Sequence, residues 1–253
     1  MSISQFIERS TLSASIFTLA SLGLTASPSK AANVNFLYSP KLGDVALDYA
    51  SDPEYSGFAV TNDGIQNDDY PQASGYYNFS GNGIIQASPY PELQNYLRLD
   101  ANALDIDGQA FEGSAITSTI TVTAKEKLSF DWLFATNETS NKDFGFFLVN
   151  NEVFKLADYT NASLPGTSGG SQKNIGIFQK NTGFNNYTYT FSRAGTYTIG
   201  FGVVDVDDYI TTSALEVKNA TLTPVPEPVT VLGSLTALGF GVIMRRLRQK
   251  MSA

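Results

Sequence analysis

Apolar and polar positions alternate in the middle of the chain. Between Ala115 and Thr123 one face would carry Ile116, Ser118, Ile120 and Val122, and the other would carry Thr117, Thr119, Thr121 and Thr123. A period of two is that of a β-strand with one buried face. After a polar connection, Leu128–Ala135 repeats the pattern, with one face made of Leu128, Phe130, Trp132 and Phe134. The two segments therefore predict two successive strands, each with one face in a core.

Other short runs rich in β-branched and aromatic residues are separated by turn residues, and they bring the prediction to about ten strands. These runs are Asn35–Tyr38, Phe58–Val60, Gly83–Ala87, Phe144–Val149, Val153–Leu156, Ile175–Phe178, Tyr187–Phe191, Thr196–Val204 and Ala214–Leu222. Between Ala32 and Thr223 no amphipathic helix of useful length is predicted, and Asn62–Asn82 is predicted to be irregular. Short strands without intervening helices favour an all-β fold, an antiparallel β-sandwich that is jelly-roll-like.

Aromatic residues divide into two groups by their surroundings. Trp132 and Phe134 belong to an alternating stripe, so we expect them in the core of the sheet. Six tyrosines lie in polar, loop-like segments and are better candidates for stacking on sugar rings: Tyr49, Tyr55, Tyr70, Tyr76, Tyr77 and Tyr90.

The N-terminus has the pattern of a secretory signal peptide. Arg9 precedes a charge-free stretch, Ser10–Ser29, whose apolar centre is Ile16–Leu24. Ser29-Lys30-Ala31 then places small residues where signal peptidase requires them. This predicts cleavage after Ala31. The alternative, an N-terminal anchor, fits less well because the apolar run is short and a cleavage site follows it.

The C-terminus has a second apolar run, 229–244, which is free of charge and is followed by basic residues. A helix of this length spans about 24 Å, less than the roughly 30 Å of a hydrocarbon core. Snorkelling arginines and local thinning of the bilayer can close that gap. The run is therefore predicted to be a short transmembrane helix. Its basic end would stay in the cytoplasm, which places the preceding domain outside.

Pro226, Glu227 and Pro228 stand directly before this run, and Arg245, Arg246 and Arg248 follow it. A Pro-Glu-Pro sequence, a short apolar run and a terminal arginine cluster, in that order, resemble the PEP-CTERM sorting signal of exported bacterial proteins. The resemblance implies recognition by an exosortase, a membrane transpeptidase that cuts near Pro-Glu-Pro and releases or re-anchors the domain. The alternative is a plain single-pass anchor, which has no need of the two prolines.

Together the two ends divide the chain into a signal peptide (1–31), an exported domain (32–223) and a sorting signal (224–253). The domain has 22 Asp and Glu but 10 Lys and Arg, a net charge of −12, so nucleic acid is a poor partner. The chain contains no Cys and no His. Disulfides, thiol catalysis, Ser-His-Asp chemistry and zinc sites built on His or Cys are therefore excluded, and paired carboxylates remain available.

Acidic residues gather in three places. The first is Asn137-Glu138 with Asn141 and Asp143, the second is Asp205-Val206-Asp207-Asp208, and the third is Asp105-Ile106-Asp107-Gly108 with Glu112. Calcium takes six to eight oxygen ligands, which loops of this kind supply. If the first two loops meet, calcium would have four candidate ligands: Glu138, Asp143, Asp205 and Asp208.

Two other interpretations of these acidic residues remain open. Asp and Asn also favour turns because their side chains bond to nearby backbone amides, and for Asp105-Ile106-Asp107-Gly108 we prefer this interpretation because the EF-hand spacing is missing. A close glycosidase pair is the other, and carboxylate separation cannot be deduced from sequence.

Several segments of the domain resemble exported PEP-CTERM proteins, many of them cyanobacterial, and more distantly the choice-of-anchor domains. These segments are Asn102–Gly108, Glu112–Ile116, Leu128–Trp132, Phe134–Glu138, Asp143–Phe147 and Gly200–Asp205. The resemblance implies a secreted β-sandwich of largely unassigned molecular function. The related proteins have a third acid where Thr212 stands here, so a calcium site transferred from them would lose one carboxylate.

The sequence favours a non-enzymatic protein of the cell envelope, surface or extracellular matrix. Signal peptidase and an exosortase would be its partners during export, and the C-terminal helix would hold it in the membrane before processing. Its sandwich would bind extracellular polysaccharide, calcium or both. One alternative is a carboxylate-dependent polysaccharide hydrolase or lyase, and another is a structural subunit of a surface layer.

Overall fold

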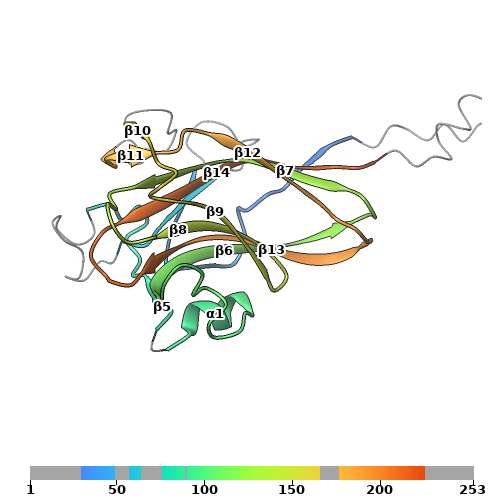
Figure 1. The fold of residues 1–253 in the computed structure, drawn as a ribbon. Helices are drawn as coiled ribbons and strands as arrows, with labels where there is room; N and C mark the ends of the chain where they lie inside the picture. Colours follow the sequence, from blue (N-terminus) through green and yellow to red (C-terminus); the bar gives the residue numbers. More distant parts are fainter. Residues whose placement is uncertain (1–29, 49–56, 64–75, 89, 166–176, 226–253) are drawn as a thin grey trace, which may run out of the picture.

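The computed structural model describes residues 30–48, 57–63, 76–88, 90–165 and 177–225. They form two antiparallel sheets that pack face to face, as predicted for a β-sandwich (Figure 1). The eight-stranded sheet consists of β1 (Ala32–Asn33), β3 (Asp44–Asp48), β4 (Gly57–Thr61), β7 (Lys127–Thr136), β10 (Leu164–Pro165), β11 (Lys180–Asn181), β12 (Asn185–Thr190) and β14 (Ser213–Thr223). The six-stranded sheet consists of β2 (Lys41–Leu42), β5 (Ile85–Gln86), β6 (Ala110–Val122), β8 (Phe144–Val149), β9 (Glu152–Asp158) and β13 (Gly195–Val206).

The order of the strands brings distant segments together. In the eight-stranded sheet it is β10-β11-β7-β14-β4-β3, with β12 beside β7 and β1 beside β14. In the six-stranded sheet it is β2-β6-β13-β8-β9, with β5 beside β6. β6 pairs with β13 and β7 pairs with β14, so β6 and β7, which follow one another in the chain, lie in different sheets. The polar connection at 123–126 therefore carries the chain from one sheet to the other.

Alternation along the strands predicts the buried faces correctly. Ile116 and Ile120 of β6 and Phe130 and Phe134 of β7 all belong to the core between the sheets. Phe201 of β13 stands at its centre. Its ring lies 4.8–5.8 Å, centroid to centroid, from those of Phe36, Phe58, Phe130 and Phe147. Packed aromatic rings of this kind supply much of the burial that holds two sheets together.

Two predicted strands are wrong. Asn35–Tyr38 is a turn, because the Asn35 side chain accepts a hydrogen bond from Leu37 N and Phe36 O accepts one from Ser39 N. Ile175–Phe178 is the other, since its described part, 177–178, is not a strand. In both segments the residue that suggested a strand, Phe36 or Phe178, is buried from a loop instead.

Other elements were not predicted. The short strands β2 and β3 are joined at Gly43, whose φ of +82° turns the chain from one sheet into the other. A Cβ at this glycine would lie 2.3 Å from Ser114 Oγ. The helix α1 (Glu92–Leu97) buries Leu93 and Leu97 on the outer face of the six-stranded sheet (Figure 1). With six residues, it is too short to give a helical period in the sequence.

The predicted aromatic roles hold in part. Trp132 packs against the core and is only partly buried, and Phe134 lies fully inside. Tyr77 is also buried, against Phe178, so the prediction that it is free to stack on sugar is wrong. Tyr76 and Tyr90 are exposed. The other three tyrosines proposed for sugar stacking lie outside the described residues.

The first and last strands lie side by side. Ala32 of β1 pairs with Leu222 of β14 (Figure 1). In the part of the chain that the structure describes, no helix is long and apolar enough to cross a bilayer. The predicted span at 229–244 and the sorting-signal residues from Pro226 onward lie outside that part.

Candidate functional site

At one end of the sandwich the core between the sheets becomes polar. On each of five strands, the row of inward-facing residues continues into a polar side chain. These are Asn62 after β4, Thr136 of β7, Asp143 before β8, Asp205 of β13 and Ser213 of β14, and all five are fully buried. We call this group, with the neighbouring Glu112, Glu138 and Asp208, the polar end.

Asp143 binds three of the strands that meet here. Its Oδ1 accepts a hydrogen bond from Val206 N at 3.0 Å, and its Oδ2 accepts from Asn62 Nδ2 and Ser213 Oγ, each at 2.9 Å. The donors come from the ends of β4, β13 and β14. Burial nevertheless raises the pKa of Asp143 well above its usual value, and the nearby Glu138 raises it further.

Glu138 and Asp208 hold the two loops at this end. Glu138 Oε2 accepts from the backbone N–H groups of Thr139, Ser140 and Asn141, at 3.1, 3.3 and 3.0 Å. Asp208 accepts from Ile210 N at 2.9 Å and from the side-chain amide of Asn141. The Asn141–Asp208 contact joins the two loops, so the condition on which the calcium hypothesis depended is met.

Asp205 differs from these acids. It is fully buried, and neither of its carboxylate oxygens has a hydrogen-bond partner. It lies directly opposite Glu112 in the β13–β6 ladder, so the two side chains share the inner face. Burial raises the pKa of Asp205 well above its usual value, and so do the nearby Asp143, Asp208, Glu112 and Glu138.

The four predicted calcium ligands are thus at one end of the sandwich, but they are not a preformed ligand set. Among the described residues, no three acidic side chains are grouped so as to hold one metal ion as they stand. Asp143 and Glu138 already accept three hydrogen bonds each. Sequence reasoning placed Glu112 with a different cluster. The signal it missed was the strand register, which only the fold supplies.

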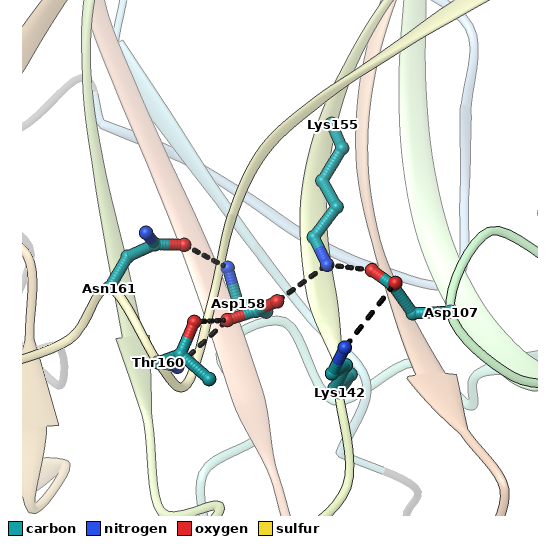
Figure 2. Close-up of polar contacts among 6 residues, drawn as sticks. All are labelled: Asp107, Lys142, Lys155, Asp158, Thr160 and Asn161. Atoms are coloured by element: carbon teal, nitrogen blue, oxygen red, sulfur yellow. Dashed lines mark hydrogen bonds and ion pairs between the residues drawn. The ribbon is translucent and has the colours of Figure 1, made fainter.

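In the third acidic cluster, 105–108, both aspartates make contacts that stabilise the local fold. Asp105 Oδ1 accepts from Ala110 N at 2.9 Å, as predicted for a turn residue. Asp107 forms ion pairs with Lys155 and, at 3.4 Å, with Lys142 (Figure 2). Lys155 also lies 2.6 Å from Asp158 and above the ring of Phe144.

This ion-pair network lies on the outside of the six-stranded sheet. Phe144, under Lys155, belongs to the cluster between that sheet and α1, and not to the core between the sheets. Lys142 and Lys155 are therefore paired with Asp107 and Asp158 on the outer face of the sheet, whereas Asp205 lies on its inner face.

A different polar group lies on the outer face of the eight-stranded sheet. Asp131 of β7 accepts from Asn186 Nδ2 at 2.9 Å and from Asn219 Nδ2 at 2.7 Å. Ser129 bonds to Asn186 and Thr188 on the neighbouring β12, at 3.3 and 3.2 Å. We call these five residues the polar ladder. Asn219 reaches Asp131 because a bulge in β14 gives it a φ of +56°, which asparagine tolerates.

No family model and no curated protein matches the chain. Among solved structures, the chain is similar to the one titled "CBM35 from Cellvibrio japonicus Abf62", with 12% sequence identity and a TM-score of 0.28. The match covers 74% of this chain and 99% of that one. At this TM-score the two backbones superpose poorly, so the likeness says nothing about what this chain binds.

Proposed function

We propose that this chain is an exported, non-catalytic protein of the cell surface or extracellular matrix, and that its jelly-roll-like sandwich binds a neutral polysaccharide. The polar ladder is the observation that carries the binding proposal. It places amides, hydroxyls and one carboxylate on the outer face of three adjacent strands, β12, β7 and β14.

The chemistry of the ladder fits sugar hydroxyls. Asn186, Thr188 and Asn219 are exposed, and their contacts with Ser129 and Asp131 hold the amides and hydroxyls in place before a ligand arrives. A preorganised row of donors and acceptors binds with less loss of side-chain entropy than a mobile one. Neighbouring strands lie about 4.8 Å apart, so the ladder offers regularly spaced partners to an extended chain. A neutral polymer suits it because the acidic domain repels anions.

The export proposal rests on the two terminal signals, and the fold is compatible with it. β1 begins at Ala32, the residue after the predicted cleavage site, and β14 ends at Thr223, directly before Pro224. Removal of the predicted signal peptide would therefore leave β1 intact. An exosortase acting at Pro-Glu-Pro would find its substrate beyond the last described strand.

The non-catalytic proposal is supported by the state of the candidate acids. Glu138 and Asp143 are buried and hold backbone and side-chain donors, which is the arrangement of structural carboxylates. A polysaccharide hydrolase needs its acid and its base beside the scissile bond. Asp205 and Glu112 form a facing pair of acids, but both are buried inside the sandwich, away from a polysaccharide in solvent.

Binding is tested by retention of the full chain, purified in detergent, on insoluble neutral glucan and on the polysaccharide of the producing cells. We expect Asp131→Ala together with Asn219→Ala to lower retention about tenfold, the effect of losing about 1.4 kcal/mol. The matched control is Thr121→Ala with Thr196→Ala, a hydroxyl pair 3.2 Å apart on the outer face of the other sheet. Equal retention of both double variants would contradict the ladder, and no retention of the unaltered chain would contradict polysaccharide binding.

A further inference from the structure

We infer that the polar end is a binding site for a hard divalent cation, with Asp205 as its central ligand and Glu112 and Asp208 as the acids that complete it. This inference does not depend on polysaccharide binding, because it concerns the interior of the sandwich and not its outer face.

The starting point is the carboxylate of Asp205. Its side chain is 0% exposed, and no donor reaches Oδ1 or Oδ2. Moving an ionised carboxylate out of water costs several kcal/mol even after the protein relaxes. Buried carboxylates therefore carry hydrogen bonds, a basic partner, a metal ion or a proton. The first two are not found for Asp205 within the described ranges 30–48, 57–63, 76–88, 90–165 and 177–225.

The surroundings of Asp205 make a basic partner still less available. Lys142 and Lys155, from the adjoining loop and strand, are paired with Asp107 and Asp158 outside the sheet (Figure 2). The groups that face Asp205 are acids: Glu112 on β6, Asp143 before β8, and Glu138 and Asp208 on the loops. A concentration of negative charge around unsatisfied oxygens is what a bound cation would stabilise.

The roles of the acids differ. Asp143 accepts three donors on its two oxygens, and Glu138 accepts three on its Oε2. We therefore assign these two acids to orienting the loops and contributing charge. Glu112 is the cross-strand neighbour of Asp205 and shares its face. Asp208 is only half-buried, accepts two donors and retains further lone pairs. It is therefore the acid that an ion entering from solvent would meet first. Because no three acids are grouped for one ion as they stand, binding would draw Glu112 and Asp208 toward Asp205.

The chemistry of the donors selects the class of ion. The chain has no His and no Cys, so every ligand is an oxygen atom. Oxygen-only sites suit calcium and magnesium, whereas zinc prefers nitrogen and sulfur. Calcium accepts irregular sets of six to eight oxygens, and magnesium demands a near-ideal octahedron. Side chains that must move to converge therefore favour calcium.

The test uses the full chain in detergent, with CaCl2, MgCl2 or EDTA, followed by isothermal titration and thermal unfolding. We expect saturable calcium binding with a dissociation constant of about 10⁻⁵–10⁻³ M, and a higher unfolding midpoint in CaCl2 than in EDTA. Asp205→Asn should lower the calcium affinity about a hundredfold. Glu112→Gln, which keeps Asp205, should lower it less. Asp100 is an exposed acid outside the polar end, so Asp100→Asn should leave the calcium affinity unchanged.

A proton on Asp205 is the competing explanation, and the same experiment separates the two. An asparagine resembles a neutral carboxyl group, so under that explanation Asp205→Asn would be as stable as the unaltered chain in both CaCl2 and EDTA. That result, or the absence of calcium binding by the unaltered chain, would overturn the inference. If Asp205→Asn does not fold, loss of affinity in Glu112→Gln supports the site, and unchanged affinity there overturns it. Retention on polysaccharide by the ladder is a separate measurement.

Discussion

Asn62 Nδ2 donates a hydrogen bond of 2.9 Å to Asp143 Oδ2, across 81 positions of sequence. The same amide group accepts 2.6 Å away from Ser213 N with its Oδ1. One side chain thus joins the end of β4, in one sheet, to the start of β8 in the other sheet and to the start of β14. These contacts of Asn62 and Asp143 join residues 63 to 151 positions apart in the chain, so only the tertiary fold can form them.

Asn62→Ala should destabilise the fold strongly. The substitution leaves Ser213 N and Asp143 Oδ2 buried with one partner fewer each, and an unsatisfied buried polar group costs about 1–3 kcal/mol. We expect a loss of about 2–4 kcal/mol in the free energy of unfolding, measured by urea denaturation. Asn185→Ala is the control, because the Asn185 amide bonds to carbonyl oxygens at an exposed position. Similar losses for the two variants would show that Asn62 has no special role.

Gly202→Ala should also destabilise the sandwich. A Cβ at Gly202 would lie 2.4 Å from Phe146 Cζ and 2.6 Å from Ser114 O, and the latter is backbone that cannot move aside alone. Overpacking of this kind costs about 1–3 kcal/mol. Gly195 provides a control on the same strand, since its nearest neighbour would be 3.6 Å away, at Tyr197. Thermal unfolding of the two alanine variants should differ clearly, and equal midpoints would contradict the packing argument.

Phe201→Ala should be among the most damaging core substitutions. It removes the ring that touches four other phenylalanines, and such truncations cost about 3–5 kcal/mol. Denaturation of Phe201→Ala and Tyr38→Ala gives the comparison, because Tyr38 is 91% exposed. We expect the Tyr38 variant to match the unaltered protein within about 0.5 kcal/mol. A small effect at Phe201 would mean that the core reforms around the cavity.

Asp158 should make stability depend on pH in the acid range. Burial alone would raise its pKa, but hydrogen bonds from Lys155 and Thr160 together hold the pKa below the ordinary value of 3.8 (Figure 2). A carboxyl with a lowered folded-state pKa contributes stability above its unfolded pKa, and that contribution is lost as the pH falls through the folded value.

The measurement is the free energy of unfolding of the unaltered chain and of Asp158→Asn from pH 7 to pH 3. We expect the unaltered chain to be more stable at neutral pH and its advantage to shrink below about pH 4. Asp100→Asn, at an exposed position, serves as the control. A difference between the chains that stays constant with pH would contradict the role given to Asp158.

The sequence predicted the all-β class and most of the long strands because the period of two is a local property. Leu128–Ala135 became β7 (Lys127–Thr136), and Phe144–Val149 is β8 without change. Local pattern failed where burial came from a loop, as at Phe36, or where an element was too short to repeat, as in α1. Nor does local pattern show that β6 and β7, successive along the chain, lie in different sheets.

Four acids of the candidate site were named from the sequence, but Glu112 and the chemistry of the site were not. The calcium hypothesis required two acidic loops to meet at one end of the sandwich, and in the structure they do. The sequence could not show that Asp143 is satisfied by three donors while Asp205 has none, since the donors come from Asn62, Val206 and Ser213. Nor could it bring Glu112 to Asp205.

By itself the sequence determined the kind of strand, the faces that are buried and the chemistry that is excluded, because side-chain alternation and residue type are properties of the chain alone. The tertiary structure decided which strands are neighbours and which acids face one another. Register between strands depends on how two whole faces pack, and a carboxylate is free or satisfied only according to the donors that this packing brings within reach. For Asp205, that difference separates a turn residue from a proposed ligand.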